Sequence, residues 1–172
     1  DWGKIKLAFK IQMMLISLVF FSLLFLSLGT GSFVKEQYSE YREGLIREKL
    51  GSVNMELIQK LGFEKSIHRA KMGNYLEYLL QKFSTVFMTD INLYDLKGGL
   101  LASSRPEIYN LGLISEQMNP RAFRNIGFKK KSVYIHEETI GSLNYLSAYI
   151  PLQNNYDEVI AYINLPYFAK QN

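Results

Sequence analysis

The sequence predicts an α+β protein in which an N-terminal transmembrane helix continues into long helices that pack on a five-stranded antiparallel sheet. This prediction rests on charge and on periodicity. Residues 11–34 carry no charged side chain, residues 35–87 repeat apolar residues near the helical period of 3.6, and the period falls to 2 after Thr89. Helices followed by a run of strands are typical of a domain whose helices lie on one face of an antiparallel sheet.

The uncharged segment at residues 11–34 is long enough to be a transmembrane helix. At 1.5 Å per residue it would extend roughly 36 Å, which exceeds a hydrocarbon core of about 30 Å. A cleaved signal peptide is the alternative. Lys4, Lys6 and Lys10 resemble its basic region, and residues 28–32 supply small side chains near a candidate cleavage point.

The basic residues around this segment bear on its orientation. A count of basic residues gives a near tie between the two flanks, but the lysines of the first flank lie closer to the membrane and glutamates dilute the second. We therefore expect residues 1–10 to be cytoplasmic and the chain after residue 34 to lie outside the cytoplasmic membrane. The predicted location is the inner membrane, with a single span in this chain and a periplasmic domain.

Two helices are expected outside the membrane, within residues 35–88. The first covers residues 35–61 and continues the membrane helix, and Gly62 stands where a helix C-cap would be. The second covers residues 67–87. Its apolar side is formed by Leu76, Leu79, Leu80, Phe83 and Phe87.

The sheet is expected within residues 89–168, and residues 169–172 would begin a juxtamembrane segment. Residues 96–99 join the first two strands, because glycine there permits the positive φ that tight hairpin turns need. Residues 105–128 form an irregular connector with a short helix at 118–123. The five expected strands cover residues 90–95, 99–104, 131–138, 142–153 and 158–165.

The predicted strands have two chemically different faces, because successive side chains of a strand point to opposite sides. In the fourth strand Leu146 and Ala148 alternate with Tyr145 and Tyr149. The aliphatic face also holds Ile91, Leu93, Val133, Ile135, Ile150, Val159, Ala161, Ile163 and Leu165. The opposite face also holds Asn92, Tyr94, Ser132, Tyr134, His136, Ser147, Ile160, Tyr162 and Asn164.

The tyrosine-rich face has two interpretations. It is a solvated or half-covered face, with aromatic residues present because strands favour them, or the connector arches over it and leaves a small-molecule pocket. In the second case Arg105 would recognise a carboxylate, since its guanidinium fork matches that geometry. The alternative for Arg105 is a solvated turn residue before Pro106. The candidate ligand-binding residues are Tyr94, Arg105, Tyr109, Tyr134, His136, Tyr145 and Tyr149.

Several of these motifs occur together in a known family. The run DINLYDLKGGLLASSRPEIYNLG, then Asn119-Pro120-Arg121-Ala122, and then LNYLSAYIPLQNNYDEVIAYINLP resemble the extracytoplasmic PAS-like sensor modules called Cache domains. The sequence is most similar to the single-module form found at the N-terminus of membrane-bound sensor histidine kinases of Bacteroidetes. The resemblance covers roughly residues 35–170.

The resemblance implies a function and a partner. A module of this kind is the sensory input domain of a two-component sensor histidine kinase. It binds an unknown small ligand or a periplasmic protein and signals across the membrane by helix displacement within a homodimer. The resemblance also implies a second membrane span after residue 172. The alternatives are a membrane-anchored scaffold or assembly subunit without a small ligand, and the input domain of a chemoreceptor or cyclase.

Other functions find little support in the sequence. The formal net charge of +4 is not gathered into a basic stripe, which argues against nucleic-acid binding, and the absence of cysteine excludes disulfides and thiolate metal sites. His136-Glu137-Glu138 lacks the second histidine of the HExxH zinc motif, because Ile140 stands there. We therefore expect no cofactor, no metal and no catalytic activity in this segment, although the full-length protein would be a histidine kinase.

Overall fold

The computed structural model describes residues 7–168, without the side chains of residues 28–39. Residues 1–6 of the expected cytoplasmic segment and the expected juxtamembrane segment at 169–172 lie outside the described residues. The chain divides between Arg42 and Glu43 into two compact units.

The first unit contains the N-terminal part of the helix α1 (Leu7–Leu61). The stretch Leu7–Ser27 has a mean hydropathy of 2.1, and none of its most apolar window is buried. Among the described residues, this is the one helical stretch long and apolar enough to cross a membrane. A helix that is apolar on all sides and unburied is typical of a membrane span, although a signal sequence near the N-terminus has the same composition.

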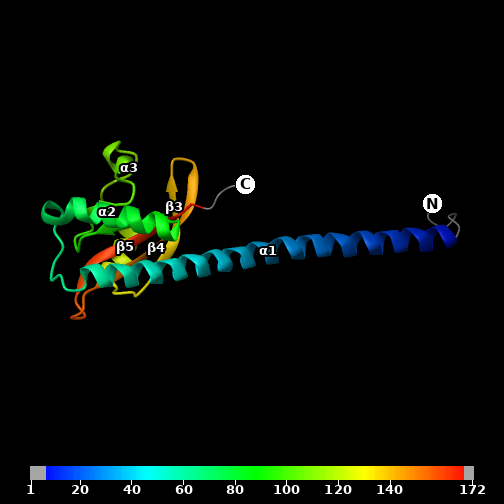
Figure 1. The fold of residues 1–172 in the computed structure, drawn as a ribbon. Helices are drawn as coiled ribbons and strands as arrows, with labels where there is room; N and C mark the ends of the chain where they lie inside the picture. Colours follow the sequence, from blue (N-terminus) through cyan, green and yellow to red (C-terminus); the bar gives the residue numbers. More distant parts are fainter. Residues whose placement is uncertain (1–6, 169–172) are drawn as a thin grey trace. The chain divides into compact units, whose positions relative to one another are not determined.

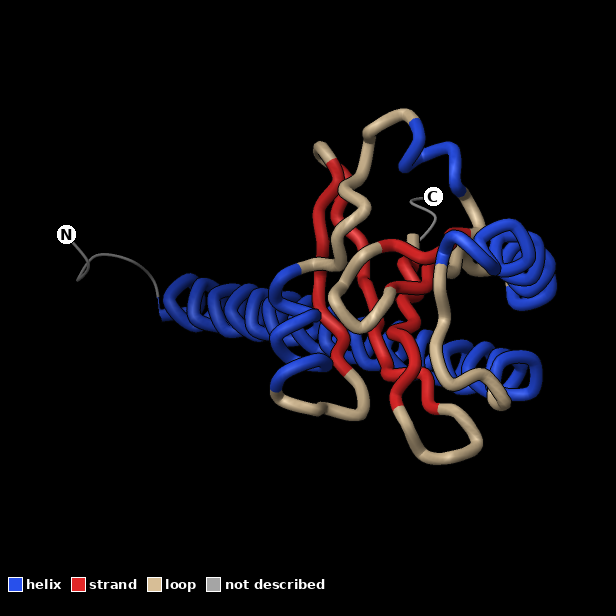
Figure 2. The backbone as a smooth tube through the Cα atoms, turned by 90° about the vertical axis from the view of Figure 1, so that its left-hand side faces the viewer, coloured by secondary structure: helices blue, strands red, loops and turns tan. Residues whose placement is uncertain are grey.

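The second unit contains the rest of α1, the helix α2 (Arg69–Phe87) and one antiparallel sheet (Figures 1 and 2). The strand order is β2-β1-β5-β4-β3. The α+β class and the five-stranded antiparallel sheet predicted from the sequence are thus confirmed. The strands are β1 (Asn92–Tyr94), β2 (Leu100–Ser103), β3 (Tyr134–Ile140), β4 (Leu143–Gln153) and β5 (Val159–Tyr167).

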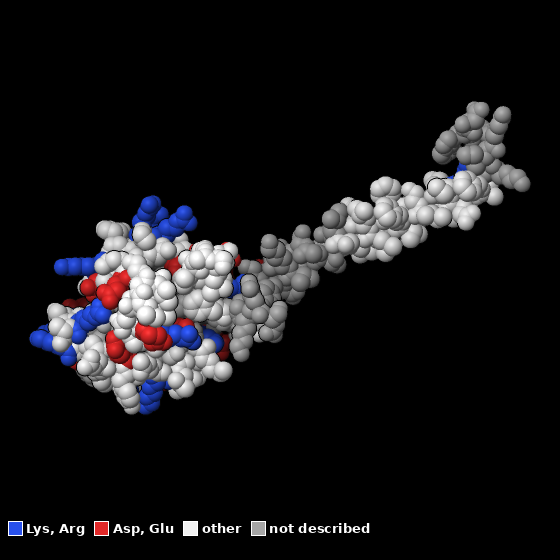
Figure 3. Space-filling view, turned by 90° about the horizontal axis from the view of Figure 1, so that it is seen from above, with Lys and Arg blue, Asp and Glu red and all other residues white. Residues whose placement is uncertain are grey.

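The surface of this unit is charged with both signs. Figure 3 shows acidic and basic side chains interspersed on the face in view. Mixed charge of this kind is ordinary for a solvated protein surface and differs from the concentrated basic footprint of a nucleic-acid-binding face.

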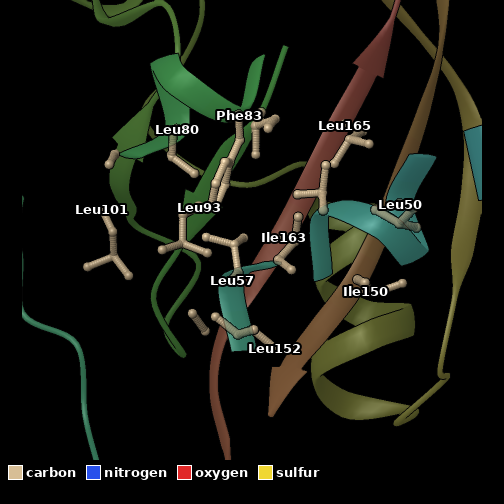
Figure 4. Packing of buried hydrophobic residues seen from close by; sticks show 14 of the residues in the cluster. Leu50, Leu57, Leu80, Phe83, Leu93, Leu101, Ile150, Leu152, Ile163 and Leu165 are labelled. Carbon is tan, nitrogen blue, oxygen red and sulfur yellow. The ribbon is translucent and has the colours of Figure 1, made fainter. Parts of the chain in front are cut away.

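The main core lies between the two helices and one face of the sheet. In the second unit, the apolar side of α1 is buried at helical spacing, as at Val53 and Leu57. The helix ends at Leu61, directly before Gly62. A Cβ at Gly62 would lie 2.5 Å from the carbonyl oxygen of Ile58, so this helix end requires glycine. Figure 4 shows side chains of α1, α2 and the strands directed toward one another in this core.

The face assignment is confirmed for most strand residues and wrong for two. Aliphatic residues of β1, β4 and β5 pack in the helix-covered core, whereas Tyr94, Tyr149 and Tyr162 pack on the other side. Ile160 lies in the helix-covered core and Val159 packs on the tyrosine side, the reverse of the prediction. The cause is a register shift between Leu152 and Gln153 of β4, which inverts the alternation at the start of β5.

The connector differs from its prediction in detail. The expected short helix begins at Pro120, as α4 (Pro120–Phe123), and continues as the π-helix η2 (Arg124–Phe128). A further short helix, α3 (Pro106–Asn110), was not predicted. Residues of the connector pack with Tyr94, Tyr149 and Tyr162, so the connector covers the tyrosine-rich face of the sheet. Strand β3 also begins three residues later than expected, at Tyr134.

Candidate functional site

A cavity of about 450 Å³ lies between the tyrosine-rich face of the sheet and the connector. Its volume falls in the range of about 300–1,000 Å³ that is usual for small-molecule sites. The strands contribute polar and aromatic residues to its lining. The connector contributes the apolar residues Ile108, Leu113, Ile114 and Met118, and Phe168, the residue directly after β5, completes the apolar part. The walls thus combine apolar surface with a limited set of polar groups.

Five of the seven residues predicted from the sequence line this cavity, namely Tyr94, Arg105, Tyr109, Tyr145 and Tyr149. Tyr134 and His136 do not line it. Their rings pack beside Tyr149. The ring centroid of His136 is 4.8 Å from that of Tyr134 and 5.9 Å from that of Tyr149. The register of β3 on β4 brings β3 to the cavity only from Glu138 onward.

Glu138 forms a polar corner of the cavity, and its side chain is 11% exposed. The Tyr145 hydroxyl donates a hydrogen bond of 2.8 Å to Oε2, and the Tyr149 hydroxyl donates one of 2.6 Å to Oε1. His136 Nε2 lies 2.9 Å from the same Oε1, in a close contact that lacks the alignment of a hydrogen bond. We call these four residues the Glu138 cluster.

Two opposing effects set the pKa of Glu138. Burial raises this pKa, whereas the contacts from His136, Tyr149 and Tyr145 lower it by favouring the carboxylate. The three contacts outweigh burial, so the pKa of Glu138 lies below its ordinary value of 4.5. Burial raises the pKa of the Tyr145 and Tyr149 hydroxyls, and the Glu138 charge raises it further. At neutral pH Glu138 is therefore an anion that faces two protonated donors.

A row of buried amides and hydroxyls crosses four strands beneath the cavity. Ser103 Oγ donates to Asn92 Oδ1 at 2.7 Å, and Asn92 Nδ2 donates to Asn164 Oδ1 at 2.9 Å. Asn164 Nδ2 donates to Ser147 Oγ at 2.7 Å and to the Ala148 carbonyl at 3.2 Å. These donors and acceptors fix the orientation of both amides, which form part of the cavity floor.

Arg105 lies at the edge of the cavity and is already paired. Its Nε is 2.8 Å from Oδ1 of Asp90, whose side chain is 13% exposed, while the Arg105 side chain itself is 59% exposed. Burial raises the pKa of Asp90, and the Arg105 charge opposes that rise. The hydroxyls of Tyr94 and Tyr109, which also line the cavity, lie 3.3 Å apart. Burial raises the pKa of both hydroxyls.

The sequence-based set of site residues omitted several that the structure brings to the cavity. Asn92, Asn164 and Glu138 share strand parity with the predicted tyrosines, so the alternation rule places them on the same face. This parity was the available signal for including them. Asp90 shares this parity within the predicted strand 90–95, although the structure begins β1 only at Asn92. Ser103, at the end of β2, has the opposite parity to the residues of its strand that pack on the tyrosine-rich face, such as Leu100.

The part of the chain that the structure describes holds no group of three or more His, Asp or Glu side chains arranged to bind a metal ion. The cavity combines aromatic walls, a row of amides, one anion that accepts hydrogen bonds from tyrosine hydroxyls, and one ion pair at the edge.

Comparisons with known proteins return solved structures. Neither a protein-family model nor a curated protein sequence matches the chain. The sensor domain of Escherichia coli DcuS is similar, with 10% identity, a TM-score of 0.48, and coverage of 73% of this chain and 89% of that domain. The Vibrio cholerae histidine kinase DctB sensor domain shows 12% identity, a TM-score of 0.47, and coverage of 77% and 59%.

The periplasmic domain of V. cholerae LuxQ is also similar, with 8% identity, a TM-score of 0.44, and coverage of 75% of this chain and 61% of that domain. The chain thus spans less than two thirds of the DctB and LuxQ domains. Similarity at this level assigns neither a ligand nor an output to this chain.

Proposed function

We propose that this chain is the extracytoplasmic sensory input domain of a membrane-bound receptor and that its cavity binds a small ligand. The observation that carries the proposal is the cavity itself, of about 450 Å³, in which aromatic rings surround a few oriented polar groups. Such a composition is typical of ligand sites, because the apolar walls provide affinity and the polar groups fix orientation.

The preorganisation of the polar groups supports this proposal. The amides of Asn92 and Asn164 and the carboxylate of Glu138 are held by neighbouring side chains before any ligand is present. A ligand that meets such groups does not have to immobilise them, so less of the interaction free energy is lost on binding.

The position of the receptor in the membrane is part of the same proposal. The apolar stretch Leu7–Ser27 would be its anchor, with a single span in this chain and the sheet domain in the periplasm. By its motif resemblance, the chain would belong to a two-component sensor histidine kinase that acts as a homodimer. Ligand binding would then favour one helix arrangement, which requires that the ligand bind the two arrangements with different affinity.

The contact between Tyr145 and Phe168 offers a route from the cavity to the end of the sheet. Their ring centroids lie 4.7 Å apart, and both rings line the cavity. Phe168 directly follows β5, whose last residue is Tyr167. A ligand that displaces either ring would therefore act on the segment that leaves the sheet.

A thermal-shift screen of the chain in detergent micelles tests the proposal. The compounds are amino acids, organic acids, sugars and amines. A ligand at about 100 times its dissociation constant should add roughly 2.7 kcal/mol of stability. We expect at least one chemical class to raise the melting temperature in a saturable manner, whereas a complete lack of stabilisation by all classes would overturn the proposal.

A further inference from the structure

We propose that the cavity selects ligands that carry an ammonium group and that Glu138 is the residue that binds this group. The inference rests on the proposed ligand-binding function of the same cavity and specifies its chemistry. It differs from the carboxylate recognition by Arg105 that the sequence suggests.

Among the charged residues that line the cavity, one has no oppositely charged partner in the lining. Asp90, Arg105 and Glu138 are the charged residues in its lining. Asp90 and Arg105 pair with each other at 2.8 Å, so their charges largely cancel. The charge that remains in the lining is the carboxylate of Glu138, which accepts hydrogen bonds from two neutral hydroxyls. Its other neighbour, His136, lies outside the lining and carries a charge only when it is protonated. A negative charge in a poorly solvated cavity attracts cations and repels anions.

Within the Glu138 cluster, the carboxylate and the two tyrosine hydroxyls can accept further hydrogen bonds, but both hydroxyl hydrogens are already donated to Glu138. A carboxylate oxygen accepts about two hydrogen bonds. Oε1 already has Tyr149 and His136 as neighbours, whereas Oε2 accepts a single hydrogen bond from the described residues, that of Tyr145. Both tyrosine hydroxyls have turned their hydrogens toward Glu138, so their oxygens offer lone pairs. An ammonium group has three N–H donors and no acceptor, which matches this corner.

The aromatic walls favour the same class of ligand. The rings of Tyr94, Tyr109, Tyr145, Tyr149 and Phe168 line the cavity. The face of an aromatic ring attracts a cation, because the ring quadrupole places negative charge on that face. The cavity therefore combines a buried anion with several rings that can surround a cation.

Arg105 is a poor anchor for a carboxylate inside the cavity. One of its nitrogens is committed to Asp90, and more than half of its side chain is exposed at the edge. An anionic ligand that reached the interior would approach Glu138 and be repelled. Carboxylates are therefore expected to bind more weakly than amines of the same shape.

Three series of probes test this inference on the detergent-solubilised chain. Each series keeps one stem and changes the head group: 2-phenylethylamine, 3-phenylpropanoate and 2-phenylethanol; n-pentylamine, hexanoate and pentanol; and the corresponding branched isopentyl compounds. Stabilisation is measured as a function of concentration for wild type, E138Q and E137Q. Glu137 is the matched control, because it neighbours Glu138 on β3 but is exposed and does not line the cavity.

We expect amines to bind wild type at least tenfold more tightly than the matched carboxylates and alcohols, and E138Q to lose this preference while E137Q keeps it. Three results would overturn the inference: no stabilisation by any amine probe, tighter binding of the carboxylates or alcohols, or equal binding of amines by wild type and E138Q. The broader proposal of a ligand-binding cavity would survive these results if compounds of another class stabilise the chain. That broader proposal fails only if no compound in the thermal-shift screen stabilises the chain.

Discussion

The hydroxyl of Tyr149 donates a hydrogen bond of 2.6 Å to Oε1 of Glu138, although the register of β3 on β4 places Tyr145 opposite Glu138. Tyr149 therefore reaches along the face of the sheet to the same carboxylate that Tyr145 contacts directly. This relationship joins two strands at the wall of the cavity and holds an anion there. The predictions on Glu138 and its neighbours follow from it.

Substitution Y149F should destabilise the fold. It removes the donor of a hydrogen bond to a charged group, for which mutational losses are about 1.5–3 kcal/mol. The free energy of unfolding, measured by urea denaturation with circular dichroism, should fall by about that amount. Y78F is the matched control, because the side chain of Tyr78 is largely exposed on α2. Equal stabilities of Y149F and Y78F would show that the hydrogen bond contributes nothing.

The stabilising effect of Glu138 should depend on pH in a defined direction. Its folded-state pKa lies below the ordinary value of 4.5, so the folded state holds the carboxylate more favourably than the unfolded state. The contribution is fully present above that ordinary value and is lost as the pH falls through the folded-state pKa. The difference in unfolding free energy between wild type and E138Q should therefore shrink when the pH is lowered from 6 toward 3. A difference that grows on acidification would contradict this prediction.

Substitution N164A should disrupt the row of buried amides. Asn164 accepts from Asn92 and donates to Ser147 and Ala148, so its removal leaves buried polar groups without partners. Each such group costs about 1–3 kcal/mol. We expect the largest stability loss among the single amide substitutions of the chain, measured by denaturant titration. N74A, at an exposed position of α2, is the control and should stay close to wild type.

Substitution L57A tests the helix-covered core. Leu57 is fully buried, and truncation of a buried leucine to alanine costs about 2–5 kcal/mol, because it removes apolar contacts and leaves a cavity. Met55 lies two residues away on the same helix and is 63% exposed. M55A should therefore leave the unfolding free energy nearly unchanged. Similar losses for both variants would contradict the placement of α1 on the sheet.

Local periodicity was sufficient to predict the two long helices, the five strands and most of the side-chain placement. The helical repeat and Gly62 predicted the end of α1 at residue 61, and strand alternation placed Tyr145 and Tyr149 away from the helix-covered core. Val159 and Ile160 were assigned to the wrong faces, because the shift at Leu152 depends on how β4 pairs with β5. Pairing between strands is not visible in the alternation of either strand alone.

The candidate site was less predictable than the fold. The α3 and η2 helices form in the connector, where packing on the tyrosine-rich face, and not a repeat in the sequence, sets the conformation. The pairing of Arg105 with Asp90 and the gathering of donors around Glu138 depend on contacts between separate strands and loops. Sequence parity can place such residues on a face, but it cannot identify their partners.

The most direct test of a ligand-binding cavity between the sheet and the connector is a calorimetric titration of wild type, L113W and L111W. The ligand is a compound that stabilises the wild-type chain in the thermal-shift screen. Leu113 is exposed and lines the cavity, whereas Leu111, which lies on the same connector and is also exposed, does not line it. The added tryptophan of L113W should obstruct the cavity and weaken binding at least tenfold, while L111W binds as wild type does. Equal affinity of all three proteins would contradict the assignment of this cavity as the ligand site.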